Sequence, residues 1–319
     1  MYYQELGFVN TRQMFRDAYE RHYAVPALYF ISIEQVNAIF DACSALRSPV
    51  ILLASPNLRA QLGSRMTARV VQAAMERCQD AGLPVPAALH LDHGKSYDAC
   101  VEAIEGGFSS VMIDGSALPF EENVALTRRV IDYAHRYQVT VEAELGALGD
   151  EHLGADHLEY TSPEMVERFV RETGADSLAI SVGTSHGMVK RHPNPDGTYP
   201  ELRYDILREV DRRLPGFPIV LHGASNLPQD CIDMINRYGG SIQNAAGIPD
   251  DQLTKAAQLN VCKVNIATDG WVTAMAHTRR ILAENPVAID SRVFTKVTRQ
   301  ELEKLYRHKI NVLGSAGKV

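Results

Sequence analysis

Short apolar runs recur along the chain, and longer amphipathic stretches separate them. Most of these runs are continuous rather than alternating, which is typical of parallel strands that are covered on both faces. They predict eight strands, at residues 25–31, 50–55, 87–92, 110–114, 140–145, 177–182, 218–222 and 261–267. Apolar side chains at helical spacing predict helices over 67–81 and 123–137, and Ser162 followed by Pro163 predicts a helix start before 164–172.

The strand and helix signals alternate through the whole sequence, and we find no internal boundary that would divide it. Eight alternations predict an α/β fold, a (β/α)8 TIM barrel, as a single domain over residues 1–319. We expect residues 289–310 to form a helical extension after the eighth strand. The segments 147–161 and 238–249 exceed the minimal repeat, and long loops in barrels often serve as lids or binding loops.

Composition narrows the class of protein without revealing its chemistry. Of the 319 residues 45% are hydrophobic, enough for a full core, but no apolar run is long enough to span a bilayer. The start of the chain lacks the pattern of a signal peptide, and the five cysteines show no Cys-x-x-Cys spacing, so we expect a cytoplasmic protein with reduced thiols. A net charge of −7 argues against nucleic acid as a partner, but it leaves room for a small anionic substrate.

Three histidines stand where an apolar run gives way to a glycine-bearing turn: His93, His186 and His222. A single histidine is more often an ordinary hydrogen-bonded residue than a metal ligand. Three at equivalent places in a barrel repeat favour a shared metal, because three nitrogen ligands and one open position are typical of catalytic zinc. We expect the other eight histidines to lie on helices or loops, mostly at the surface.

Carboxylates also stand at the predicted strand ends. Asp92 precedes His93, Asp114 ends the fourth strand, and Glu144 lies near the end of the fifth. A carboxylate within an apolar strand is costly unless it is paired, hydrogen-bonded or bound to a metal. For Asp114 and Glu144 the alternatives are a shared cation or an ion pair with a basic residue of the barrel interior, for which Lys263 is available.

Glycines beside these positions suggest a phosphate site. Gly187, Gly223 and Ser225 offer backbone amides and a hydroxyl, and residues 265–268 add donors after the eighth strand, a place where barrels often bind phosphate. Taken singly, each glycine is equally well explained by turn geometry, and Lys190 by an ordinary solvated lysine. No Gly-x-Gly-x-x-Gly follows a strand, so a dinucleotide cofactor is not indicated.

These motifs together resemble the class II, zinc-dependent family of fructose-bisphosphate and tagatose-bisphosphate aldolases. The resemblance covers nearly the whole chain and rests on six motifs in order: His-Leu-Asp-His-Gly (90–94), Glu-Ala-Glu-Leu-Gly (142–146), Gly-Thr-Ser-His-Gly (183–187), Leu-His-Gly-Ala-Ser (221–225), Lys-Val-Asn-Ile-Ala-Thr-Asp (263–269) and Gly-Ser-Ala-Gly-Lys (314–318). It implies a (β/α)8 barrel, a homodimer or homotetramer, that acts on dihydroxyacetone phosphate and an aldehyde.

The resemblance also implies roles for single residues. His93, His186 and His222 would hold Zn²⁺, and Asp114 and Glu144 would belong to a second divalent or monovalent cation site. Asp92 would exchange a proton with the aldehyde oxygen, and Glu151 in the lid would act at the ketose carbon. The phosphorylated sugar would contact residues near the strand ends, namely Ser55, Gly187, Lys190, Gly223, Ala224, Ser225, Asn265, Ile266, Ala267 and Thr268.

The sequence departs from the family pattern at positions that would contact the aldehyde half of the substrate. Tyr29 and Ile31 replace polar residues with bulk, Ala267 follows the tagatose-like pattern, and Trp271 stands where many relatives have a base for the distal phosphate. Fructose or tagatose 1,6-bisphosphate is therefore the default substrate, and a ketose 1-phosphate without the distal phosphate is the alternative. A non-catalytic barrel that binds metal and phosphate, and a metal-dependent isomerase or epimerase, are further hypotheses.

Overall fold

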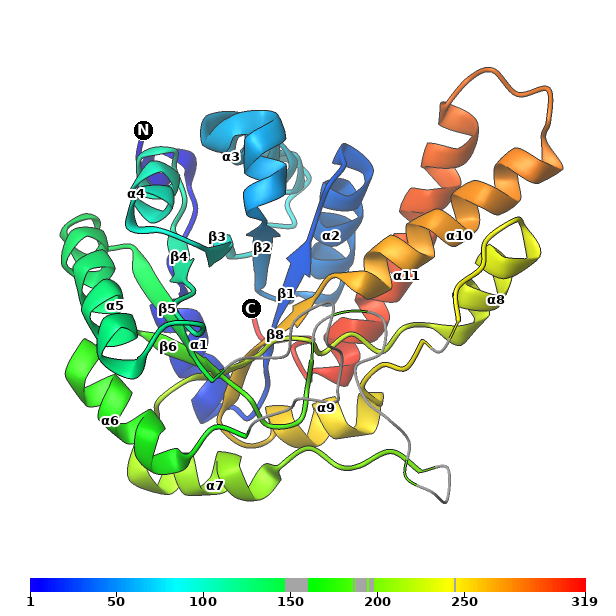
Figure 1. The fold of residues 1–319 in the computed structure, drawn as a ribbon. Coiled ribbons are helices and arrows are strands. Elements are labelled where there is room, and N and C mark those ends of the chain that lie inside the picture. Colours follow the sequence, from blue (N-terminus) through cyan, green and yellow to red (C-terminus); the bar gives the residue numbers. More distant parts are fainter. Residues whose placement is uncertain (147–159, 186, 188–193, 195–197, 244) are drawn as a thin grey trace.

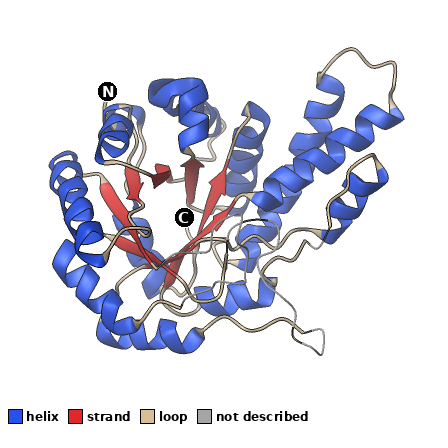
Figure 2. Ribbon diagram, viewed as in Figure 1, coloured by secondary structure: helices blue, strands red, loops and turns tan. Residues whose placement is uncertain are grey.

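The computed structural model describes residues 1–146, 160–185, 187, 194, 198–243 and 245–319. Eight parallel strands close into a barrel in chain order, as the sequence predicts, and helices surround it (Figure 2). The strands are β1 (Val25–Tyr29), β2 (Val50–Ala54), β3 (Ala87–Gly94), β4 (Ser110–Ile113), β5 (Thr140–Leu145), β6 (Ser177–Ile180), β7 (Ile219–Leu221) and β8 (Val261–Ile266). All eight predicted strands are present, and their ends differ from the prediction by at most two residues.

Two helices of the described part precede β1, and the others follow the strands in turn. They are the 3-10 helices η1 (Tyr3–Leu6) and η2 (His135–Tyr137) and the α-helices α1 (Thr11–Glu20), α2 (Ile33–Leu46), α3 (Pro56–Asp80), α4 (Tyr97–Glu105), α5 (Phe120–Ala134), α6 (Pro163–Thr173), α7 (Tyr204–Arg213), α8 (Gln229–Arg237), α9 (Asp250–Ala257), α10 (Thr268–Glu284) and α11 (Arg292–Val312). No helix in this part of the chain is long and apolar enough to cross a membrane.

Several helix boundaries differ from the sequence prediction for local reasons. The helix expected over 67–81 is the second part of α3, which begins at Pro56 and bends at Gly63, where φ is 72° and ψ is 154°. The helix expected over 123–137 begins three residues earlier and ends in η2. The predicted start of α6 is confirmed, since the Ser162 hydroxyl accepts a hydrogen bond from the Met165 amide.

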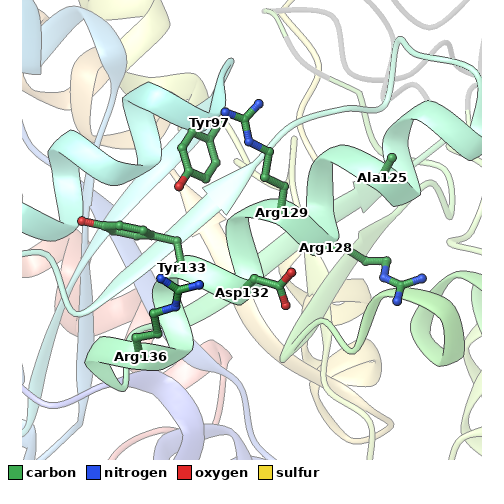
Figure 3. Close-up of a pocket in the computed structure, with 7 residues that line it drawn as sticks. All are labelled: Tyr97, Ala125, Arg128, Arg129, Asp132, Tyr133 and Arg136. Atoms are coloured by element: carbon green, nitrogen blue, oxygen red, sulfur yellow. The ribbon is translucent and has the colours of Figure 1, made fainter.

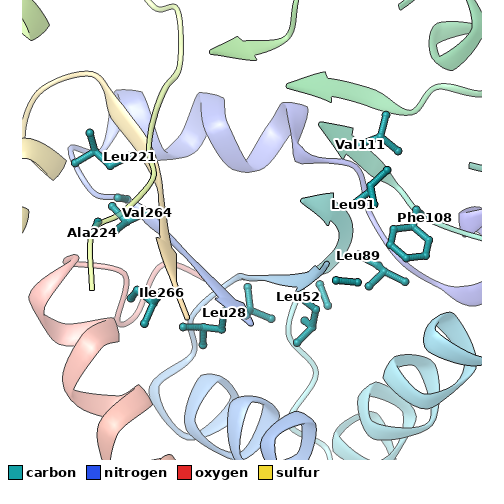
Figure 4. Close-up of a cluster of buried hydrophobic side chains, with 14 of the residues drawn as sticks. Leu28, Leu52, Leu89, Leu91, Phe108, Val111, Leu221, Ala224, Val264 and Ile266 are labelled. Atoms are coloured by element: carbon teal, nitrogen blue, oxygen red, sulfur yellow. The ribbon is translucent and has the colours of Figure 1, made fainter. Parts of the chain in front are cut away.

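The apolar core has an outer and an inner part. One cluster joins alternate strand residues such as Leu52, Leu89 and Val264 to the surrounding helices (Figure 4). A second cluster brings Met14 and Phe15 of α1 against strand residues of the barrel interior. Because side chains alternate along a strand, the remaining inward positions can carry polar groups without breaking the outer core.

The last two helices extend the barrel on one side. α10 and α11 pack against each other, α11 also packs along α2, and α8 lies beside α10 (Figure 1). The turn between α10 and α11 exposes Val287 and Ile289, whose relative exposures are 90% and 102%. The helical extension expected after the eighth strand is thus present, with α11 at Arg292–Val312 rather than 289–310.

Candidate metal and substrate site

Polar side chains gather where the strands end, at one mouth of the barrel. Asp92 of β3, Glu144 of β5 and Asn265 of β8 are buried within strands, and His222 follows β7 directly. Parallel strands place their carboxyl ends on the same face of the barrel, which is where barrel enzymes build their sites. Residues from distant parts of the sequence therefore meet there.

A distortion of β3 turns two consecutive residues toward this mouth. The register between β3 and β4 shifts between Leu91 and Gly94, and His93 adopts a φ of 49°, which is rare for a non-glycine residue. A Cβ added at Gly94 would lie 2.5 Å from the Met112 carbonyl oxygen, so the neighbouring strand leaves room only for glycine. This distortion lets both Asp92 and His93 reach the site, where a regular strand would point them to opposite faces.

Carboxylates fix the orientation of His93 and His222, the two predicted metal-binding histidines that the structure describes. The Nδ1 atom of His93 lies 2.9 Å from Asp114 Oδ2, and the Nε2 atom of His222 lies 2.8 Å from Glu142 Oε1. We assign the tautomers from these partners, so that each of these nitrogens donates its proton. With a metal ion in place of the remaining proton, the ligand atoms would be Nε2 of His93 and Nδ1 of His222, which lies 3.3 Å from Glu144 Oε2. Carboxylates that orient metal-binding histidines in this way are typical of metal sites.

The donors at the mouth fit a cation. Ligand atoms of Asp92, His93 and His222 all lie within 4.8 Å of one another, and so do those of His93, Asp114 and Glu144. The rings of His93 and His222 are 4.8 Å apart between centroids. Both sets could hold a metal ion, and His93 belongs to each of them.

The electrostatics of the mouth attract positive charge. Burial alone would lower the pKa of both imidazoles, but Asp92 and the hydrogen bond to Asp114 raise the pKa of His93 above its usual value. For His222 the hydrogen bonds to Glu142 and Glu144 outweigh burial and raise the pKa to about 10. An environment that favours a proton on each ring also favours a metal ion in its place.

Asp92 itself is an ionised carboxylate with a fixed orientation. Burial would raise its pKa, but the charges of His93 and His222 lower it well below the usual range. The Asn265 amide donates to Asp92 Oδ1 at 2.9 Å, and the Tyr29 hydroxyl donates to Asp92 Oδ2. Tyr29, which the sequence analysis treats as bulk in place of a polar contact, is therefore a polar contact; that expectation was wrong.

A second polar layer lies below the mouth. Lys263 is fully buried, and its ammonium donates to Glu142 Oε2 at 2.8 Å. His90, also fully buried, lies 3.4 Å from Lys263 Nζ and 2.8 Å from Ser110 Oγ. The expectation that the remaining histidines lie on helices or loops is wrong for His90, because inward positions of a strand can be polar. Burial, and then the charge of Lys263, lower its pKa to about 3, so this ring is neutral.

Lys263, which the sequence analysis offers as an ion-pair partner for Asp114 and Glu144, contacts neither of them. Lys263 pairs with Glu142 and with no other carboxylate among the described residues. Asp114 instead contacts His93 and the exposed Lys95, whose Nζ lies 2.5 Å from Asp114 Oδ2. Both hydrogen bonds lower the pKa of Asp114 well below its usual range, although burial opposes them.

The residues expected to bind substrate do not all present side chains to the mouth. Ser55 caps α3, where its hydroxyl accepts from the Leu58 amide at 3.1 Å. Ala224 and Ile266 belong to the outer apolar core, so they offer only backbone groups to a ligand. Gly223 has a φ of 60°, and a Cβ there would lie 2.4 Å from the Ser185 carbonyl oxygen.

The segment after β8 brings further donors near this turn. The Ala267 amide donates to Ser225 Oγ at 3.4 Å, and α10 begins at Thr268. The amino end of a long helix attracts anions through its backbone amides. Gly187 is described and half-buried, whereas Glu151, His186 and Lys190 lie outside the described residues.

Trp271 lies in the first turn of α10, near the same mouth. Its ring meets that of Tyr29 edge to face, with centroids 5.9 Å apart and planes at 71°. Trp271 is 42% exposed, so this aromatic pair faces solvent on one side. Two aromatic rings therefore lie at the place where the sequence analysis notes the absence of a base.

A separate surface pocket of about 450 Å³ lies on the outside of the barrel, over α4, α5 and η2 (Figure 3). It is lined by Tyr97, Ala125, Arg128, Arg129, Asp132, Tyr133 and Arg136. The Arg129 guanidinium stacks over the Tyr97 ring at 4.0 Å. These residues lie on helices and not at strand ends, where barrel enzymes have their active sites. We therefore take the barrel mouth, and not this pocket, as the candidate active site.

Comparison with known proteins fits this geometry. A sequence model of the family described as "Fructose-bisphosphate aldolase class-II" matches residues 9–318. The chain belongs to the class II fructose-bisphosphate aldolase family. As a member of this family it is an aldolase, a carbon–carbon lyase, as the sequence analysis predicts.

Individual relatives resemble it over more than nine tenths of their length. A protein of Treponema pallidum named fructose-bisphosphate aldolase is 48% identical over 99% of both chains. One of the same name from Giardia intestinalis is 37% identical over 96% of this chain and 93% of its own. The crystal structure of the YdjI aldolase from Escherichia coli superposes with a TM-score of 0.76 at 27% identity, covering 98% of this chain and 99% of that one.

Proposed function

We propose that this class II aldolase is zinc-dependent and reversibly cleaves a ketose phosphate into dihydroxyacetone phosphate and an aldehyde. The observation that carries the proposal is the pairing of an ionised, doubly hydrogen-bonded Asp92 with a donor set for a cation at the barrel mouth. This pairing supplies a base for one reacting atom and a site for a Lewis acid beside it.

In this proposal His93 and His222 hold the metal together with His186, which lies outside the described residues. The oriented imidazole lone pairs fit zinc, which prefers nitrogen ligands and keeps one position open in catalytic sites. When bound, the ion would act as a Lewis acid that withdraws electron density from the substrate carbonyl. Asp114 and Glu144, the carboxylates of the second set, would bind the additional cation.

Asp92 would carry the proton of the aldol step. In cleavage its carboxylate accepts the O–H proton of the hydroxyl group on the carbon that becomes the aldehyde. The electrons of the broken carbon–carbon bond pass to the dihydroxyacetone phosphate fragment, and condensation reverses both movements. Glu151, proposed to act at the ketose carbon, lies outside the described residues.

The phosphate of dihydroxyacetone phosphate would bind beside the turn after β7 and the start of α10. Gly223 brings the backbone close to the mouth, Ser225 offers a hydroxyl, and Thr268 begins a helix of 17 residues. Gly187, Lys190, Asn265 and the backbones of Ala224, Ile266 and Ala267 complete the proposed contacts, and Ser55 would contribute from the end of β2.

Removal of the metal tests the proposal directly. We expect a chelator to abolish cleavage of fructose 1,6-bisphosphate or tagatose 1,6-bisphosphate, and added Zn²⁺ to restore it. Asp92→Asn with bound zinc should lose cleavage as well, because the amide cannot accept the proton. Full activity of the metal-free protein would refute the mechanism, and an isomerised product without cleavage would favour an isomerase or epimerase instead.

A second candidate substrate is a ketose 1-phosphate without the distal phosphate. The observation that favours it is the Tyr29–Trp271 pair at the mouth, which presents aromatic edges where a bisphosphate needs a cation. A panel of ketose mono- and bisphosphates would decide by comparing kcat/KM. Absence of turnover on every member would favour a non-catalytic barrel that binds metal and phosphate.

We also propose a cytoplasmic homodimer or homotetramer. The exposed Val287 and Ile289 between α10 and α11 form an apolar tip that a second copy would cover. All five cysteines are buried thiols, which fits a reducing compartment. Sedimentation of the intact protein tests the assembly, and a monomer at micromolar concentration would refute it.

A further inference from the structure

The Tyr29 hydroxyl contacts Asp92, the proposed base, but Tyr29 itself has no role in the proposed mechanism. It is the last residue of β1, and its hydroxyl donates to Asp92 Oδ2 while the Asn265 amide donates to Oδ1 at 2.9 Å. β2 separates β1 from β3 in the barrel, so the Tyr29 side chain reaches past one strand to make this contact. Each oxygen of Asp92 thus has its own donor from a different strand.

Asp92 also lies close enough to the histidines to be a ligand instead of a base. Its Oδ2 atom is 3.9 Å from Nε2 of His93, and it forms a donor set with His93 and His222. A carboxylate beside a divalent ion readily coordinates it. A carboxylate that coordinates the ion shares its negative charge with it, becomes a weaker base and turns toward the ion, so the two roles compete.

We propose that Tyr29 is a positioning residue that keeps Asp92 in the role of proton acceptor. The hydrogen bond from Tyr29 occupies a lone pair of Oδ2, the Asp92 oxygen that lies 3.9 Å from His93 Nε2, and so opposes rotation of the carboxylate toward the ion. The ring is itself held by its edge contact with Trp271. This inference rests on the proposed aldolase mechanism and adds a residue to it.

The test compares two reactions of the zinc-loaded protein. Carbon–carbon cleavage needs Asp92, whereas exchange of a carbon-bound proton of dihydroxyacetone phosphate with deuterium oxide, followed by NMR, does not. We expect Tyr29→Phe to lower kcat for cleavage about 10- to 100-fold, the usual effect of losing a hydrogen bond to a charged group. The exchange rate and KM should stay within about threefold, and zinc affinity, measured by chelator competition, should be unchanged or higher.

Tyr97→Phe is the matched control, because it removes a hydroxyl from a half-buried tyrosine on α4, away from the mouth. It should leave both reactions unchanged. Cleavage by Tyr29→Phe at the wild-type rate would overturn the inference. So would a parallel loss of cleavage, exchange and zinc affinity, which indicates a loosened site. A wild-type protein that performs neither reaction with zinc would instead refute the proposed function itself.

Discussion

The buried ion pair between Lys263 and Glu142 makes a quantitative prediction about stability. Both side chains are at most 1% exposed, and their charged atoms are 2.8 Å apart. Removing one partner of such a pair leaves an uncompensated buried charge, which costs about 3–5 kcal/mol. We therefore expect Lys263→Met and Glu142→Gln each to destabilise the metal-free protein strongly.

The structure ranks the two substitutions. Burial would raise the pKa of Glu142, but Lys263 and His222 lower it to about 2 from 4.5, a difference equivalent to about 3 kcal/mol. In Lys263→Met, Glu142 keeps His222, so we expect a loss of about 3 kcal/mol. In Glu142→Gln, the nearest described partner left to Lys263 is the neutral His90, so we expect about 5 kcal/mol.

Thermal unfolding of the chelated protein, followed by far-ultraviolet circular dichroism, measures both losses. At about 2 °C per kcal/mol for a chain of this size, Tm should fall by about 6 °C for Lys263→Met and 10 °C for Glu142→Gln. The double variant should lose about 2–3 kcal/mol less than the sum. Lys255→Met is the matched control: its ion pair with Glu201 has the same 2.8 Å distance but is exposed, so it should cost less than about 1 kcal/mol. Single variants as stable as this control, or strictly additive losses, would refute the reasoning.

Three further predictions concern other parts of the chain. Trp271→Arg should lower KM for a bisphosphate relative to its 1-phosphate about tenfold, because a guanidinium adds a charge-assisted contact; an unchanged ratio would exclude a distal phosphate near this residue. Val287→Glu combined with Ile289→Glu should shift sedimentation toward the monomer, and an unchanged profile would place the interface elsewhere. Gly223→Ala should lower kcat/KM at least about tenfold because its Cβ would displace a backbone carbonyl. Gly174→Ala shares the positive φ but meets nothing within 4 Å, so its kcat/KM should match wild type.

The sequence predicts the barrel well because its signals are local. Continuous apolar runs mark each strand, and capping residues such as Ser162 mark helix starts, so all eight strands and α6 follow from pattern alone. The ends are less certain because tertiary contacts decide them. β3 continues through His93 to Gly94 only because its backbone can bulge there against β4.

The candidate site was predictable as a set of residues but not as a set of contacts. Asp92, His93 and His222 stand at strand ends in the sequence, and the structure brings them together. The contact of Tyr29 with Asp92 was not predictable, because a tyrosine in an apolar strand cannot be told from a packing residue until its hydroxyl has a partner. Lys263 gave a weak signal as a charged residue inside an apolar run, but its partner lies 121 residues away.

The polar interior has two layers with different tasks. Asp92, Glu144 and Asn265 each lie two residues beyond a second polar residue of the same strand, namely His90, Glu142 and Lys263. Positions two apart share a face, so each strand supplies one side chain to the mouth and one below it. The lower layer balances charge and orients His222 through Glu142, while the upper layer lies at the mouth, where we propose that the substrate binds. Substitutions below the mouth should therefore change stability and metal affinity first, whereas those at the mouth should change turnover with little loss of stability.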